Sequence, residues 1–209
     1  MDPQNPNLGL ILDFAAGKPG KQAQIVHEQY KMLTEPDRRP QDFYRVALGA
    51  IKAAATAPDP ARVFASALAR VEGNASKSRH YRAVFDGFAR GWSFDDTLVP
   101  LETATFRLKS VGMRVNPQLG VRSPSGELSA VFLYLKNEPV TKDDVQPILF
   151  AMKEVMDTVL PGARPRILYV RAGEYLDIDR RSTRQRQALR IAGLLGQWTA
   201  MWQQIADAA

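Results

Sequence analysis

One stretch, AVFLYLKNEP at residues 130–139, constrains the fold of this chain more than any other. In an extended strand, successive side chains point to opposite faces of the sheet. The stretch therefore presents two sets of side chains on opposite faces: Val131, Leu133 and Leu135, and Phe132, Tyr134 and Lys136. Both faces are apolar until Lys136, so both must be covered, as in the inner strands of sheets with parallel pairing. The pattern predicts an inner strand over residues 128–136, with neighbours on both edges.

The residues that follow predict a helix that crosses back over the sheet. Thr141 and Asp144 have the spacing of a capping box, although Pro147 fits better if the helix begins nearer Asp144, where its missing N–H costs nothing. PGARP then ends the helix, and RILYVRAGEYL has the pattern of another strand. A strand, a helix and a second strand in this order predict parallel pairing through a right-handed crossover. The helix is indicated by apolar residues at helical spacing: Val145, Ile148, Leu149, Met152, Val155, Met156 and Val159.

The remaining segments complete a mixed α/β (α+β) prediction. Residues 1–20 are rich in Pro, Asn and Gly, which predicts a loosely structured arm that docks through its apolar residues Leu10–Leu12 and Phe14. Four short helices are expected between Lys21 and Trp92, followed by one or two strands over 106–123 and a hairpin turn at 124–126. A last helix is expected from about Thr183. We therefore expect a flexible arm and helical unit over 1–95, and a small mixed sheet with a C-terminal helix over 96–209.

Composition narrows the classes of function. The 209 residues include no cysteine, which excludes disulfides, thiol catalysis and cysteine-ligated metal. No basic start leads into an apolar leader, and no apolar run approaches the roughly 20 residues that span a bilayer. We expect a soluble, cytoplasmic protein with no membrane association. The net charge of +6 favours an acidic partner such as nucleic acid, and the alternative is a solvated basic surface.

The order of hairpin, crossover helix and further strand resembles the core of the PD-(D/E)XK nucleases. The segments VNPQLGV, VFLYLKNEP and ILYVRAG are also similar to a set of uncharacterised bacterial proteins with strands of the types VNPELGL, KLYFK and VLDVRRGKL. The resemblance covers about residues 76–178. It implies a fold more strongly than an activity, because no established reaction accompanies those relatives.

The nuclease pattern implies an acid two residues before Lys136, but Tyr134 stands there. A second acid is implied near the end of the preceding strand, and the stretch Asn116–Arg122 holds none. Mg²⁺ is usually held by one or two carboxylates with water and phosphate, and a tyrosine does not supply that charge. If the chain is a nuclease, Lys136 with Glu138 and Glu127 would form the migrated site. We otherwise expect no catalytic residue, no metal and no cofactor, and interpret Lys136 as a strand-end residue whose ammonium reaches solvent.

Two basic segments are candidates for phosphate contacts. The stretch DIDRRSTRQRQALR places arginines around an expected helix start, where free N–H groups also favour anions. The second segment, KSRHYRAVFDGFAR, lies on the fourth expected helix. The candidate nucleic-acid-binding residues are Arg180, Arg181, Arg184, Arg186, Lys77, Arg79 and Arg82. The alternative for both segments is a solvated helix face.

Three hypotheses about function follow from these observations. The first is a non-catalytic, cytoplasmic nucleic-acid-binding or assembly protein on a degenerate nuclease-like scaffold. The second is a divergent metal-dependent nuclease. The third is a protein-binding adaptor that presents Trp198, Met201 and Trp202 on its last helix to a partner chain.

Overall fold

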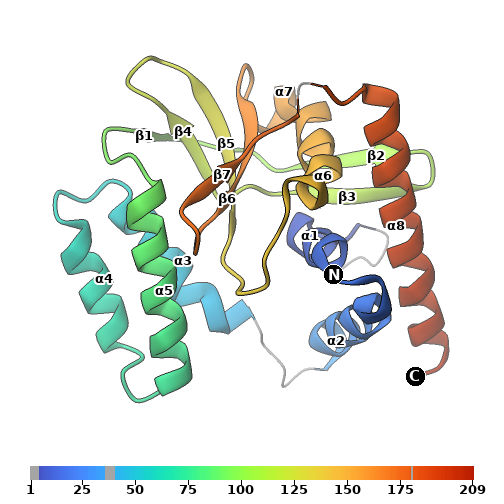
Figure 1. Ribbon diagram of the computed structural model, residues 1–209, viewed down its shortest axis with the longest axis horizontal. Coiled ribbons are helices and arrows are strands. Elements are labelled where there is room, and N and C mark those ends of the chain that lie inside the picture. The colour runs from blue at the N-terminus through green and yellow to red at the C-terminus, as the bar shows by residue number, and fades with distance from the viewer. Residues whose placement is uncertain (1–4, 36–40, 180) are drawn as a thin grey trace.

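The computed structural model describes residues 5–35, 41–179 and 181–209, and it has a mixed α+β fold (Figure 1). Eight α-helices lie in the described ranges, and a short 3₁₀ turn, η1 (Pro19–Lys21), precedes the second of them. The helices are α1 (Leu8–Ala16), α2 (Gln22–Thr34), α3 (Gln41–Ala54), α4 (Pro60–Ala69), α5 (Ala75–Gly91), α6 (Lys142–Glu154), α7 (Met156–Val159) and α8 (Arg184–Asp207). Within the described ranges, none of these helices is long and apolar enough to cross a membrane.

The central sheet has five strands in the order β1-β4-β5-β6-β7, and β2 and β3 form a separate antiparallel pair. The strands are β1 (Thr97–Val99), β2 (Ala104–Leu108), β3 (Val111–Val115), β4 (Leu119–Arg122), β5 (Leu128–Tyr134), β6 (Arg164–Tyr169) and β7 (Glu174–Leu176). Strand β5 pairs antiparallel with β4 and parallel with β6. The predicted inner strand and βαβ crossover are therefore confirmed, although the strand ends at Tyr134. The expected one or two strands before the hairpin turn are three.

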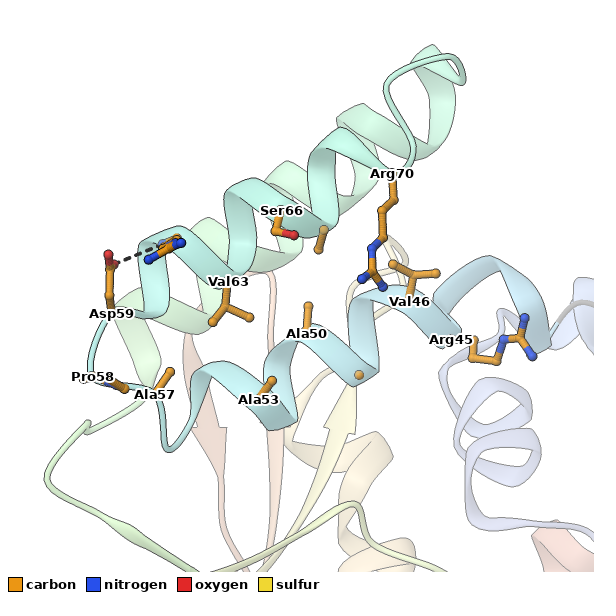
Figure 2. A pocket seen from close by; sticks show the side chains of 13 residues that line it. Arg45, Val46, Ala50, Ala53, Ala57, Pro58, Asp59, Val63, Ser66 and Arg70 are labelled. Atoms are coloured by element: carbon orange, nitrogen blue, oxygen red, sulfur yellow. Dashed lines mark hydrogen bonds between the residues drawn. The ribbon is translucent and has the colours of Figure 1, made fainter.

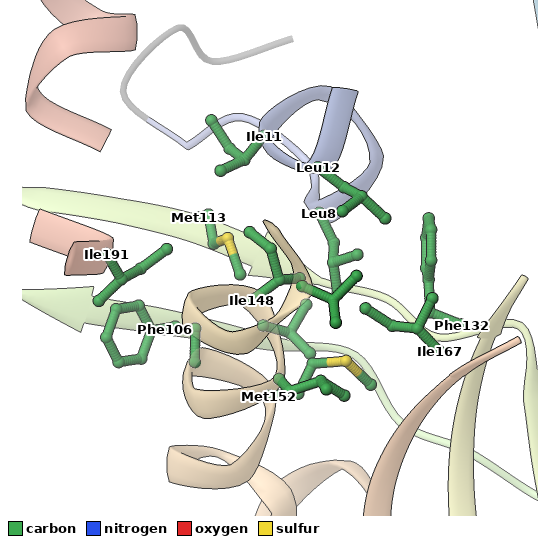
Figure 3. Close-up of a cluster of buried hydrophobic side chains, with 14 of the residues drawn as sticks. Leu8, Ile11, Leu12, Phe106, Met113, Phe132, Ile148, Met152, Ile167 and Ile191 are labelled. Carbon is green, nitrogen blue, oxygen red and sulfur yellow. The ribbon is translucent and has the colours of Figure 1, made fainter. Parts of the chain in front are cut away.

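Two hydrophobic clusters cover the two faces of the sheet. Alternate residues of β5 divide between them, with Phe132 in the first cluster and Leu133 in the second. Helices α1, α6 and α8 contribute to the first cluster, part of which is drawn in Figure 3. Helices α3, α4 and α5 supply the second, on the other side of the sheet in Figure 1. Each cluster draws residues from both sides of the boundary expected at residue 95.

The predicted loose arm is instead a buried helix. In α1 the Asn7 side chain accepts a hydrogen bond from the Leu10 N–H at 3.0 Å, which caps the helix start. Leu8, Ile11 and Leu12 are fully buried against the core (Figure 3). Burying several large apolar side chains stabilises by roughly 1.5–3 kcal/mol each, which explains why a short helix rich in Gly and Asn neighbours is ordered here.

Helix α6 begins at Lys142 with the predicted Thr141–Asp144 capping box, so Pro147 lies inside the helix and not at its start. A proline removes the N–H that would bond to the carbonyl four residues earlier, which is that of Asp143. The Arg190 guanidinium of α8 donates to this carbonyl at 2.9 Å and to both oxygens of the Asp143 carboxylate. The partner from α8 explains why the proline is tolerated.

Helix α5 packs so closely against the turn between β6 and β7 that the two backbones are in direct contact. A Cβ added at Gly87 would stand 2.0 Å from the Val170 carbonyl oxygen, and one at Gly91 would stand 2.5 Å from that of Gly173. Both distances are far below contact, so only glycine fits at these two helical positions. The pair fixes α5 across the carboxyl ends of β5 and β6.

Candidate functional site

The carboxyl end of the central strand holds an ion pair that joins two distant parts of the sequence. Lys136 follows β5, and its Nζ lies 2.6 Å from Oδ2 of Asp13 on α1. The Asp13 side chain is 13% exposed and that of Lys136 is 46% exposed. Lys136 therefore reaches solvent as expected, and its partner is an acid that the sequence pattern did not single out.

Burial raises the pKa of Asp13 to about 6, because desolvation disfavours the charged carboxylate more than Lys136 favours it. The carboxylate of Glu138 adds to this rise, which places a second acid near the pair. The pKa of Tyr134 is also raised, first by burial and then by the charges of Asp13 and Glu138. Perturbed titratable groups in one place are characteristic of functional sites, although structural ion pairs produce them too.

The donor atoms do not fit the metal centre that the nuclease resemblance implies. Tyr134, at the acid position, is 3% exposed and its ring packs at 5.8 Å from that of Tyr169. The carboxylate of Asp13 is held by Lys136, so Glu138 is the remaining acid of the ion-pair region. In the stretch Asn116–Arg122, the Gln118 side chain accepts the Leu133 N–H at 2.7 Å. Among the described residues no three His, Cys, Asp or Glu side chains form a group that could hold a metal ion.

Glu127 lies at the other end of β5 and takes no part in the Lys136 region. It directly precedes β5, at the opposite end of the strand from Tyr134, and its Oε2 accepts from Arg164 at 2.7 Å. The structure thus brings Lys136 near Glu138 but not near Glu127.

A groove of about 780 Å³ opens beside Lys136, and we call it the α2 groove. One wall is formed by the end of α1 and by α2, and the other by the connection from β5 to α6. Its charged lining residues are Lys18, Lys21, Glu28, Lys136 and Glu138. The positive and negative charges nearly balance, so the groove as a whole is not a strongly basic channel.

On the other side of the strand ends, Arg171 connects three elements. Its Nε donates to the Leu135 carbonyl at 3.1 Å, and its guanidinium contacts Nδ1 of His80 on α5. Arg90 in turn donates to the Arg171 carbonyl at 2.8 Å. Lys77 lies 5.7 Å from the centre of the Phe43 ring. The side chains of Arg171, Arg90 and Lys77 are therefore partly engaged in contacts within the protein.

The arginine segment before α8 is divided between paired and exposed side chains. Arg184 forms an ion pair with Glu154 of α6, and Thr183 caps the helix start. Arg181 and Arg186 are exposed and form no ion pair with another described residue. Arg180 lies outside the described residues. As candidates for phosphate contacts, these arginines stay a prediction.

Helices α3, α4 and α5, which we call the helical lobe, hold a different set of basic side chains. Four exposed arginines, Arg62, Arg70, Arg79 and Arg82, form no ion pair with any described residue. Figure 2 shows the groove of about 620 Å³ between α3 and α4, with Ala50, Ala53 and Val63 pointing into it and Arg70 reaching across from α4 towards Val46. Asp59 is the acid of this lining, and it caps α4 by accepting the Arg62 N–H at 3.1 Å.

The tryptophan stripe of α8 is part of the core, so the prediction that it faces a partner chain is wrong. Trp198 and Trp202 are 1% and 7% exposed. The Trp198 indole donates to Gln29 of α2 at 2.8 Å, and the Trp202 ring lies 5.1 Å from that of Tyr30. Helix α2 occupies the position that the partner was expected to take, and Met201 is half-buried beside it.

No protein-family model, no curated protein and no solved structure matches this chain. The candidate sites therefore stand on the geometry described above.

Proposed function

We propose that the protein binds nucleic acid through its phosphates and does not cut it, and that the helical lobe makes the main contacts. The observation that carries this proposal is the set of exposed arginines without ion-pair partners: Arg62, Arg70, Arg79 and Arg82. An arginine with no carboxylate partner presents its full charge and planar fork to an external anion.

The distribution of charge supports the same lobe. Residues 41–91 contain eight Lys and Arg against four Asp and Glu, so this quarter of the chain contributes +4 of the net +6. A local excess of positive charge on one lobe attracts a polyanion more than the same charge spread over the surface does. The lobe has no element that suggests base readout, and phosphate contacts alone predict binding with little sequence preference.

The test is fluorescence anisotropy with labelled single-stranded DNA, duplex DNA and duplex RNA at two salt concentrations. Phosphate binding releases counterions, so four engaged arginines predict a slope of about −3 to −4 in log K against log salt. The double variant Arg79→Ala/Arg82→Ala should flatten that slope by up to about two units. The matched control is Arg181→Ala/Arg186→Ala, which removes two exposed arginines from the other end of the chain.

Equal loss in the two double variants would extend the contact surface to the segment before α8. If only the Arg181→Ala/Arg186→Ala variant loses affinity, the helical lobe is not the binding surface. No measurable binding of any of the three nucleic acids would overturn the proposal.

The second candidate is a divergent metal-dependent nuclease. It is favoured by the closeness of Asp13 and Glu138 to Lys136 at the carboxyl end of the central strand, although the carboxylate of Asp13 is engaged. Purified protein with Mg²⁺ or Mn²⁺ is expected to leave DNA and RNA intact. Cleavage that disappears in both Lys136→Ala and Glu138→Ala would establish the nuclease instead.

A further inference from the structure

We propose that the α2 groove binds a small amphipathic anion, with its acidic head at Lys18 and Lys21 and its apolar tail along α2. This site is separate from the helical lobe and does not depend on nucleic-acid binding. The groove's volume of about 780 Å³ lies within the range of roughly 300–1,000 Å³ found for small-molecule pockets.

The groove follows one face of α2. The lining residues from Lys21, which directly precedes this helix, and from the helix itself recur at helical spacing: Lys21, Gln24, Ile25, Glu28, Gln29 and Met32. From Lys21 to Met32 this face extends about 16 Å at the rise of an α-helix. A ligand in the groove is therefore long and narrow.

The tail region is apolar along this length. Ile25 and Met32 are only half-buried by the protein itself, and Ala16 and Pro139 face the same space from the two walls. Covering half-exposed apolar side chains is favourable at roughly 25 cal/mol per Å² of area removed from water. An apolar tail is the chemistry that gains from this lining.

The head region carries the unbalanced charge. Lys18 and Lys21 are exposed and form no ion pair with any described residue, whereas Lys136 is held by Asp13. Helix α2 begins at Gln22 directly after η1, whose Pro19 carbonyl accepts the Gln22 N–H. Two free ammonium groups favour an anion at this end. The carboxylate of Glu138 disfavours an anion at the opposite wall of the groove.

The ligand class is thus a carboxylate, sulfonate or phosphate ester with an extended hydrocarbon tail. The probe is decanoate, measured by isothermal titration calorimetry below its micelle concentration. Three companions separate head from tail: hexanoate has a shorter tail, decyltrimethylammonium has the opposite charge, and decanol has none. We expect one saturable site for decanoate, binding of hexanoate weaker by about tenfold or more because four buried methylenes are lost, and no saturable binding of the cation.

The double variant Lys18→Gln/Lys21→Gln should weaken decanoate by about tenfold, since it removes both free ammonium groups. The control Lys31→Gln/Lys52→Gln removes the same charge from α2 and α3 outside this groove and should bind as the wild type does. Thermal unfolding of both variants checks that the fold is intact. A second variant, Met32→Gln, should weaken decanoate while leaving hexanoate nearly unchanged.

The proposal is overturned by any of three results. The cation binds as tightly as decanoate, the two double variants bind decanoate equally, or the wild type binds none. In the first case the groove binds apolar tails without regard to the charge of the head. In the second case decanoate is attracted by the overall positive charge of the protein and not by Lys18 and Lys21.

Discussion

The helical lobe and the region around the sheet differ in whether arginines join neighbouring elements through ion pairs. Around the sheet, Arg164, Arg166, Arg184 and Arg190 each form an ion pair with a carboxylate of a neighbouring element. Five exposed arginines outside the lobe form no ion pair with a described residue: Arg107, Arg114, Arg122, Arg181 and Arg186. In the helical lobe, Arg62, Arg70, Arg79 and Arg82 have no such partner among the described residues. Four arginines thus hold elements together around the sheet, whereas these four arginines of the helical lobe hold none together. Net charge alone does not distinguish these two uses.

The largest expected effect on stability comes from the contact between α5 of the helical lobe and the β6–β7 turn. Gly87→Ala puts a methyl group 2.0 Å from the Val170 carbonyl, which forces α5 away from the β6–β7 turn. We expect a loss of about 4 kcal/mol or more in the free energy of unfolding, measured by urea denaturation. The control is Gly193→Ala on α8, where no atom lies within 4 Å and a gain of about 0.5–1 kcal/mol is expected from helix propensity. Equal stabilities would mean that the lobe is loosely attached to the sheet.

The second prediction concerns the sheet face that the helical lobe covers. Leu133 is 4% exposed and belongs to the cluster shared with α3, α4 and α5. Leu133→Ala should destabilise the protein by about 2–5 kcal/mol, the usual range for a truncated core side chain. A loss below 1 kcal/mol would show that the contact between lobe and sheet is not well packed.

The third prediction concerns the charge that the sheet region buries at its strand end. The pKa of Asp13 is raised from 3.8 to about 6, while Lys136, Glu138 and the hydroxyl of Tyr134 face it. Between pH 3.8 and about 6, the carboxyl group of Asp13 is more fully protonated in the folded protein than in the unfolded chain. The free energy of unfolding therefore decreases by about 2–3 kcal/mol as the pH rises from 4 to 6, and it stays at the lower value above pH 6.

Asp13→Asn removes that penalty, so the variant should be about 2–3 kcal/mol more stable than wild type at pH 7.5 and similar to it near pH 4. Chemical denaturation at both pH values measures the difference, and the control is Glu72→Gln, which removes an exposed acid from the turn after α4. A variant that is less stable at pH 7.5 would show that the ion pair with Lys136 outweighs the cost of burial.

The smallest expected effect distinguishes an arginine that is paired from one that is not. Arg190→Met breaks the bonds to Asp143 and leaves the carbonyl opposite Pro147 without its donor, which should cost about 1–2 kcal/mol. Arg79→Met removes an exposed, unpaired arginine and should cost less than about 0.5 kcal/mol. Two equal losses in thermal unfolding would remove the distinction between paired and available arginines.

The sequence correctly predicted the elements that are determined by residues close together in the chain. The two-sided apolar run before Lys136 requires an inner strand, and Thr141 with Asp144 requires a helix start between them. The helix over Leu8–Ala16 was missed, because its Pro, Asn and Gly neighbours favour turns and its order comes from burial. Asn7 and Gly17 at its ends were signals that could have indicated it.

The candidate sites were harder to predict because they join distant residues. The partner of Lys136 is 123 positions earlier in the chain, and one signal for Asp13 was a lone acid within the apolar run LGLILDF. The partners of Arg184 and Arg190 come from α6, which no spacing rule connects to α8. The tryptophan stripe has the same periodicity whether it faces a partner or the chain's own α2, so sequence alone could not decide between them.

The contact between Gln29 and Trp198 has a consequence for how the protein is made. The two residues are 169 positions apart, so α1 and α2 are synthesised long before the helix that covers them. At about 5–20 residues per second, their apolar faces wait on the order of ten seconds or more for α8. During that time Leu10, Ile11 and Phe14 have no complete core to enter, and transiently exposed apolar surface of this kind is prone to aggregation.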